Sequence, residues 1–214
     1  MKMREIIGQQ FIIGISGEEL TADEAQFIVE NNIGGIILFE RNLKSIEQIH
    51  KLINDLQKLR YKTPQQTPLF ISVDMEGGRV HRLKEPFTQW PAVQHIGNMD
   101  SSSVAFQFTQ LMGKELKAMG FNLDYAPCVD VLMNKDNKVI GDRTLSNDPE
   151  VVAKLSSAMV RGYIKSDVIS CAKHFPGHGF TSVDSHFDLP VDQRTLKDLE
   201  ENGDLEPFKK VIKS

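Results

Sequence analysis

The chain has 214 residues, of which 40% are hydrophobic and 25% are charged, and this composition indicates one folded domain rather than a disordered segment. Its formal net charge of -4 at pH 7 argues against a nucleic-acid partner or an anionic membrane surface. The sequence shows no apolar run near the roughly 20 residues of a membrane span, no signal peptide, and two widely separated cysteines, Cys128 and Cys171, so we expect a cytoplasmic protein with free thiols.

The first half of the chain alternates short apolar runs with longer helical patterns. A buried strand is predicted at 10–15, followed by a helix for which Thr21 is the N-cap and Glu24 completes a capping box. The second strand is predicted at 34–39, and the helix after it at 45–59. That helix is indicated by one apolar face, formed by Ile46, Ile49, Leu52, Ile53 and Leu56.

The same alternation continues in the second half. A third strand is predicted at 68–74, and a helix at 102–120 ends on Gly120, which suits a left-handed C-cap. A fourth strand at 121–127 precedes a helix at 149–166 that begins with Pro149. The fifth strand is predicted at 168–174, and residues 206–214 are expected to form a last helix.

The order of these elements predicts a parallel α/β sheet. An open doubly wound sheet and a (β/α)₈ barrel both fit the alternation, but a complete barrel needs eight strands and typically about 250 residues. We count five β/α units, and five barrel strands alone would leave two unpaired sheet edges. We therefore expect residues 1–214 to form one domain that is incomplete at its C-terminal side.

Charged residues follow the third strand and occupy one later loop. Asp74 and Glu76 are expected to face Arg79 and Arg82 around Gly77-Gly78, a pair of glycines that allows close backbone approach to a ligand. The loop at 141–148 carries Asp142 and Arg143. A turn with surface ion pairs is the alternative explanation of the first stretch, and the second stretch by itself is a weak signal that an ordinary loop explains.

The stretch KHFPGHGFTSVDSH, residues 173–186, holds three of the six histidines. Lys173 and His174 end the fifth predicted strand, on the side where barrel enzymes place their chemistry. Asp184 can orient His186 and stabilise its protonated form, which would make the imidazole a general acid or base near neutral pH. Pro176 and Gly177 interrupt any helical pairing of the histidines, so we expect no metal site.

Three motifs together, VDMEGGRVHR (73–82), GDRTLS (141–146) and the histidine stretch, resemble the bacterial β-N-acetylglucosaminidases of glycoside hydrolase family 3. The resemblance implies a (β/α)₈ barrel that removes terminal β-linked N-acetylglucosamine from cell-wall fragments during peptidoglycan recycling, without a cofactor. It assigns the general acid/base to His186 and its orienting partner to Asp184. It also assigns sugar contacts to five residues: Asp74, Arg82, Arg143, Lys173 and His174.

The aspartate nucleophile of that family follows the sixth or a later strand, and no residue before Ser214 matches it. We therefore predict that the 214-residue chain alone is inactive and that its partner is a muropeptide or glycoside containing N-acetylglucosamine. Two alternatives stay open. One is a phosphorylase of the same family, because a neutral histidine admits anionic phosphate where a carboxylate would repel it. The other is a short form that binds sugar without catalysis.

Overall fold

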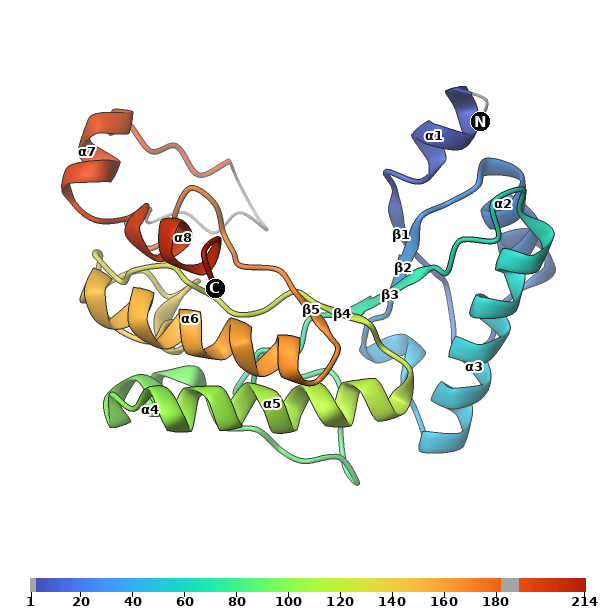
Figure 1. The fold of residues 1–214 in the computed structure, drawn as a ribbon, viewed down its shortest axis with the longest axis horizontal. Coiled ribbons are helices and arrows are strands. Elements are labelled where there is room, and N and C mark those ends of the chain that lie inside the picture. The colour runs from blue at the N-terminus through green and yellow to red at the C-terminus, as the bar shows by residue number, and fades with distance from the viewer. Residues whose placement is uncertain (1–2, 182–188) are drawn as a thin grey trace.

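The computed structural model of the chain describes residues 3–181 and 189–214 (Figure 1). Its five strands are all parallel and stand in chain order. Sequential parallel strands are the winding of a β/α barrel, whereas a doubly wound sheet reverses its order at an inner strand. The structure thus selects the barrel winding, with these strands: β1 (Ile12–Gly14), β2 (Gly35–Ile37), β3 (Phe70–Val73), β4 (Leu123–Asp124) and β5 (Ile169–Ser170).

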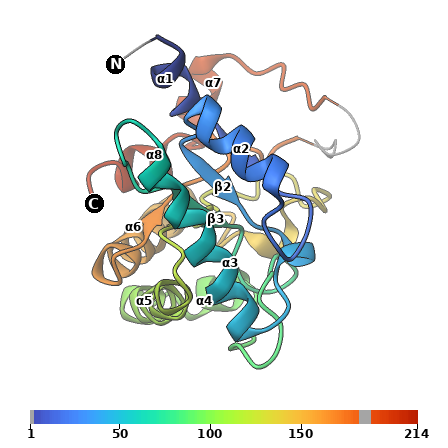
Figure 2. The ribbon, with the colours of Figure 1, turned by 90° about the vertical axis from the view of Figure 1, so that its right-hand side faces the viewer.

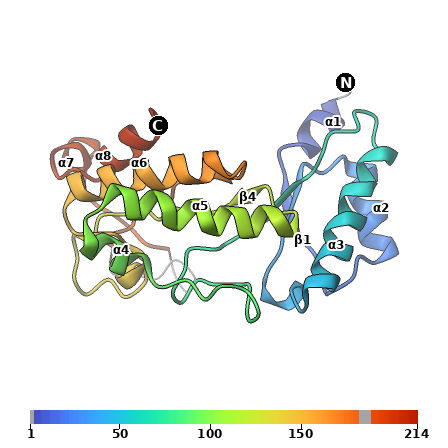
Figure 3. The same cartoon turned by 60° about the horizontal axis from the view of Figure 1, so that its bottom comes forward.

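The helices of the described residues lie outside this curved sheet. Helices α2 (Ala22–Asn31) and α3 (Ile46–Lys58) lie in front of β2 and β3 in Figure 2. Helices α5 (Ser102–Met119) and α6 (Pro149–Lys165) run side by side near β4 and β5 (Figures 1 and 3). Short 3₁₀ turns occupy Glu40–Asn42, Leu59–Lys62 and Gly141–Arg143. The helices are α1 (Met3–Gly8), α2 (Ala22–Asn31), α3 (Ile46–Lys58), α4 (Val93–Met99), α5 (Ser102–Met119), α6 (Pro149–Lys165), α7 (Leu196–Glu201) and α8 (Glu206–Val211).

The helix ends follow the predicted local signals. Thr21 and Glu24 form the reciprocal capping box of α2. Gly120 ends α5 with a φ of 101°, in the left-handed region where glycine is favoured. Pro149 occupies the first turn of α6. Ile46, the first residue of α3, is 38% exposed, whereas Ile49 and Leu52 of the predicted apolar face are buried.

The fourth and fifth strands are shorter than predicted, and their backbone hydrogen bonds explain why. Pro127 has no amide hydrogen to contribute to a regular ladder. The N–H of Cys171 is shared between the carbonyls of Asp124 and Ala126, and the N–H of Lys173 donates to the carbonyl of Pro127. The two segments therefore stay adjacent beyond the strands, as far as an isolated parallel bridge between Cys128 and Lys173.

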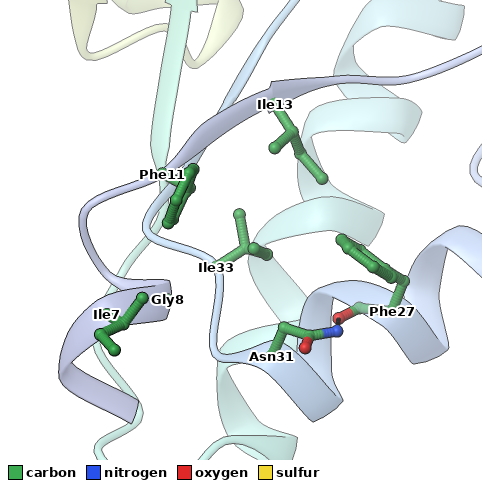
Figure 4. A pocket seen from close by; sticks show the side chains of 7 residues that line it. All are labelled: Ile7, Gly8, Phe11, Ile13, Phe27, Asn31 and Ile33. Atoms are coloured by element: carbon green, nitrogen blue, oxygen red, sulfur yellow. Dashed lines mark hydrogen bonds between the residues drawn. The ribbon is translucent and has the colours of Figure 1, made fainter. Parts of the chain in front are cut away.

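The two outer strands have open edges within the described part of the chain, since β1 pairs only with β2 and β5 only with β4. Beside β1 lies an apolar hollow of about 220 Å³ between α1, β1 and α2 (Figure 4). Phe11 and Phe27 in its wall are 54% and 53% exposed. Its lining contains none of the predicted site residues: it is formed by Ile7, Gly8, Phe11, Ile13, Phe27, Asn31 and Ile33. None of the described helices has the length and apolar character to cross a membrane.

Candidate active site

Charged side chains meet where β3 and β5 end. Asp74 directly follows β3, and Lys173 lies three residues beyond β5. Because the carboxyl ends of parallel strands share one edge, these residues become neighbours although 99 positions separate them. The Nζ atom of Lys173 lies 2.6 Å from Oδ1 of Asp74 and 2.6 Å from Oε1 of Glu76.

Glu76 is the buried centre of this group, with a side chain only 2% exposed. Arg143, from the 3₁₀ turn after β4, donates from Nε and Nη2 to the two carboxylate oxygens of Glu76, both at 2.9 Å. Burial alone would raise the pKa of Glu76, but the hydrogen bonds from Arg143 and the charge of Lys173 outweigh it and hold this pKa below its usual value. The pKa of Lys173 is raised, because Glu76 and Asp74 outweigh the opposing effect of burial.

The predicted pairing of Asp74 and Glu76 with Arg79 was wrong. Gly77 and Gly78 have φ values of 91° and 58° and turn the chain back, so that the N–H groups of Glu76 and Gly77 both donate to the carbonyl of Val80. Arg79 is thereby directed toward the loop before α6, where its Nε donates to Asp142 at 3.1 Å. The partners of Glu76 are Arg143 and Lys173, which lie in segments after β4 and β5 and which the sequence neighbours of Glu76 could not reveal.

His174 links Arg143 to a second buried acid. Its Nδ1 lies 2.6 Å from Oδ2 of Asp130, and its Nε2 lies 3.2 Å from Nη2 of Arg143. Asp130 is fully buried, and burial would raise its pKa, but the hydrogen bonds that it accepts from the side chain of His174 and the backbone N–H of His178 hold the value below the ordinary one. Sequence reasoning missed Asp130, although a lone acid in the apolar run APCVDVLM (126–133) needs a buried partner.

Cys128, Asp130 and His174 place one donor atom each within 4.8 Å of one another, which is the spacing of a metal site. These atoms, however, are hydrogen-bonded to one another, since both Cys128 and His174 contact the carboxylate of Asp130. The thiol of Cys128 donates to Asp130 at 3.2 Å, and burial raises the pKa of that thiol well above its usual value. Asp130 also accepts backbone N–H groups from His174 and His178. The arrangement is a hydrogen-bonded cluster around one carboxylate.

A third buried acid, Asp124, supports the backbone beside Asp74. It ends β4, accepts the N–H of Met75 at 2.9 Å and the hydroxyl of Tyr163 at 2.8 Å, and is fully buried. Burial raises the pKa of Asp124 to about 8. Asp124 was not among the predicted site residues, although it too is an acid within an apolar run.

Four of the five predicted sugar-contacting residues are therefore joined in one chain of contacts that runs Asp74, Lys173, Glu76, Arg143, His174. Arg82 is not joined to it by a hydrogen bond or an ion pair within the described residues, and its buried Nε has no partner there. His186 and Asp184, the predicted acid/base pair, lie outside the described residues. On either side of them, Arg194 stacks over the ring of Phe180 at 4.0 Å and forms ion pairs with Asp192 and Asp204.

Comparison with known proteins agrees with this architecture. Residues 2–214 match the N-terminal domain of glycosyl hydrolase family 3. The chain is 36% identical to the beta-hexosaminidase of Hydrogenovibrio crunogenus over 99% of its own length and 60% of that protein. It is 42% identical to the beta-hexosaminidase of Neisseria meningitidis serogroup B over 91% of its length and 54% of that protein.

A solved structure gives the same result. NagZ from Neisseria gonorrhoeae in complex with N-trifluoroacetyl-D-glucosamine superimposes with a TM-score of 0.84 at 40% identity, covering 92% of this chain and 58% of that one. The fold and the charged residues at its strand ends are those of a β/α-barrel domain of the kind that enzymes use. The chain belongs to glycoside hydrolase family 3, and it spans 54% to 60% of the two curated relatives named above.

Proposed function

We propose that this chain forms the sugar-binding N-terminal part of a retaining glycosidase that removes terminal β-linked N-acetylglucosamine. The natural substrate would be a peptidoglycan-derived muropeptide or a related glycoside, processed in the cytoplasm. The family membership and the names of the relatives support the reaction class. The ligand of the gonococcal NagZ complex, a glucosamine derivative, supports the kind of sugar.

The observation that carries this proposal is the contact between Lys173 and the two carboxylates Asp74 and Glu76. Glu76 is buried, whereas the side chain of Asp74 is 21% exposed and that of His174 is 34% exposed. Within the described residues, Oδ2 of Asp74 has no hydrogen-bond partner. A partly open carboxylate beside fixed cations offers an acceptor and donors together, which is what a sugar hydroxyl requires.

The rigidity of the group serves binding as well. Lys173 and Arg143 are held by buried carboxylates, so they do not need to reorder when a sugar arrives. In the proposed reaction His186 protonates the leaving oxygen, with Asp184 as its orienting partner. Retention of configuration requires a carboxylate nucleophile about 5 Å from the acid/base, and we assign it to a residue outside positions 1–214.

Calorimetric titration of the chain with N-acetylglucosamine tests the proposal. The wild-type chain should bind the sugar, and Asp74→Asn should weaken binding because it removes the charge that anchors Lys173 and accepts a hydroxyl. Asp142→Asn is the matched control, since Asp142 is an acid outside the group whose ion-pair partner among the described residues is Arg79. No binding by the wild type, or equal loss in both variants, would refute the proposed site.

A further inference from the structure

We propose that Asp130 is a positioning residue of this site: it holds the imidazole of His174 as the Nδ1–H tautomer, so that Nε2 offers an acceptor to a sugar hydroxyl. The tautomer assignment stands on the geometry of this chain alone. The statement about the sugar rests on the proposed function.

The imidazole nitrogen of His174 that faces Asp130 carries a proton. Asp130 is fully buried and accepts hydrogen bonds from the thiol of Cys128 at 3.2 Å, the N–H of His178 at 2.7 Å and the N–H of His174 at 3.2 Å. An ionised carboxylate is an acceptor only. The 2.6 Å contact between Oδ2 and Nδ1 of His174 is therefore a hydrogen bond donated by the imidazole, and Nδ1 carries the proton.

The other imidazole nitrogen, Nε2, is an unprotonated acceptor. Nη2 of Arg143 lies 3.2 Å from Nε2 of His174. A guanidinium group can only donate, so Nε2 must accept with its lone pair. A proton on Nε2 would place two N–H groups against each other. Both neighbours thus select the same tautomer of a neutral imidazole.

Neither neighbour is free to move away. Arg143 is held by both oxygens of Glu76 and by the carbonyl of Val139 at 3.2 Å. The backbone carbonyl of Asp130 accepts the hydroxyl of Thr144, the residue that follows Arg143. The imidazole therefore sits between two anchored groups, with 34% of its side chain exposed. Because Nε2 has one lone pair, a ligand hydroxyl that donates to it must take the place of Nη2 of Arg143, and the N–H released there can then donate to the oxygen of the same hydroxyl.

The substitution Asp130→Asn should remove the preference of His174 for one tautomer. The amide side chain that it introduces has one oxygen and a donor group, and that donor cannot satisfy the N–H groups of His174 and His178. We expect His174 to lose its single tautomer and N-acetylglucosamine to bind about tenfold more weakly, the cost of one misplaced hydrogen bond. Asp142→Asn again serves as the control, with unchanged tautomer and affinity.

Long-range proton–nitrogen NMR spectra of histidine-labelled protein provide the test, with the His174 signals identified by their loss in His174→Ala. Wild-type protein should show a protonated Nδ1 and an unprotonated Nε2. A protonated Nε2 in the wild type overturns the inference, and this readout decides even if Asp130→Asn does not fold. A folded Asp130→Asn protein with wild-type tautomer and affinity also overturns it.

The sugar titration separates this inference from the proposed function. If the wild type shows the assigned tautomer but binds no N-acetylglucosamine, Asp130 is supported as the group that positions His174, while the sugar ligand is refuted. If the wild type binds the sugar with Nε2 protonated, the proposed function stands and the role of Asp130 is refuted.

Discussion

Lys173 and Asp74 lie 99 positions apart in the sequence, yet the Nζ atom of Lys173 lies 2.6 Å from Oδ1 of Asp74. This contact links the segments that follow β3 and β5, and Glu76 is the second partner of the Lys173 amine. Because the side chain of Lys173 is only 14% exposed, the three charges depend on one another for stability.

Lys173→Met should therefore destabilise the protein. Removing one partner of a largely buried ion pair leaves the others uncompensated, and we expect the free energy of unfolding to fall by about 3 kcal/mol. The control is Lys51→Met, since Lys51 is 65% exposed in its pair with Asp55 and should contribute less than about 0.5 kcal/mol. Urea denaturation of both variants measures the difference, and equal stability of Lys173→Met and wild type would contradict the interpretation.

Glu76 should make the free energy of unfolding depend on pH in the acid range. Its pKa in the folded protein lies below the ordinary value of 4.5, so its contribution is present above that value and is lost as the pH falls through the lowered one. Glu76→Gln should be less stable than wild type at neutral pH, and its stability should decline less on acidification. Denaturation curves across the acid range check this, and identical acid slopes for the two proteins would be inconsistent with it.

Asp124 should contribute stability that is lost as the pH rises, which is opposite to the effect of Glu76. Its pKa rises from 3.8 to about 8 on folding because it is buried, so the folded state holds this proton more tightly than the unfolded state does. Its contribution is complete below pH 3.8 and is lost as the pH rises through about 8. The stability of Asp124→Asn should therefore decline less than that of wild type across this interval. Parallel alkaline declines in the two proteins would contradict the assignment.

A substitution at Gly179 tests how tightly the backbone of the histidine stretch packs against the segment that contains Asp130. A methyl group on Gly179 would lie 1.7 Å from the carbonyl oxygen of Val131, the neighbour of Asp130. Gly179→Ala should push these segments apart, lower stability by about 1–3 kcal/mol and weaken sugar binding. Gly17→Ala is the control, because nothing lies within 4 Å of the added atom. Thermal unfolding and the sugar titration report on both effects, and Gly179→Ala behaving like Gly17→Ala would be the contrary result.

Catalysis should need more than residues 1–214. General acid catalysis by a histidine supplies about 10²–10⁴-fold, whereas enzymes typically reach roughly 10⁶-fold or more. We expect no hydrolysis of an aryl N-acetylglucosaminide by this chain, and turnover once it is extended with the corresponding C-terminal part of the meningococcal relative. In the extended form His186→Ala should slow poor leaving groups most. Turnover that requires phosphate would indicate the phosphorylase alternative, and robust hydrolysis by the 214 residues alone would show that the nucleophile lies among them.

Much of the fold could be predicted because local signals and tertiary packing agree. The capping box of Thr21, the apolar face of α3 and the glycine after α5 each specify an element without help from distant residues. Helices α1, α4 and α7 were not predicted. Gly97 weakens the helical pattern of α4, and it is required where a side chain would meet the carbonyl of Leu145.

The site could be predicted only in part, for a related reason. The motifs indicated Asp74, Arg143, Lys173 and His174, but sequence neighbours suggested Arg79 as the partner of Glu76. The actual partners come from segments that follow other strands, and only the winding of the sheet brings them together. Asp130 and Asp124 were missed because buried acids in apolar runs look like interruptions of a strand until their hydrogen-bond partners are known.

The crystal structure of this chain soaked with N-acetylglucosamine tests the central claim most directly. We predict that the sugar lies at the carboxyl ends of β3 and β5, with hydroxyl groups within hydrogen-bond distance of Asp74, Lys173 and His174 Nε2. A sugar bound elsewhere, for example in the apolar hollow beside β1, would contradict the account, as would a site that stays empty at saturating sugar.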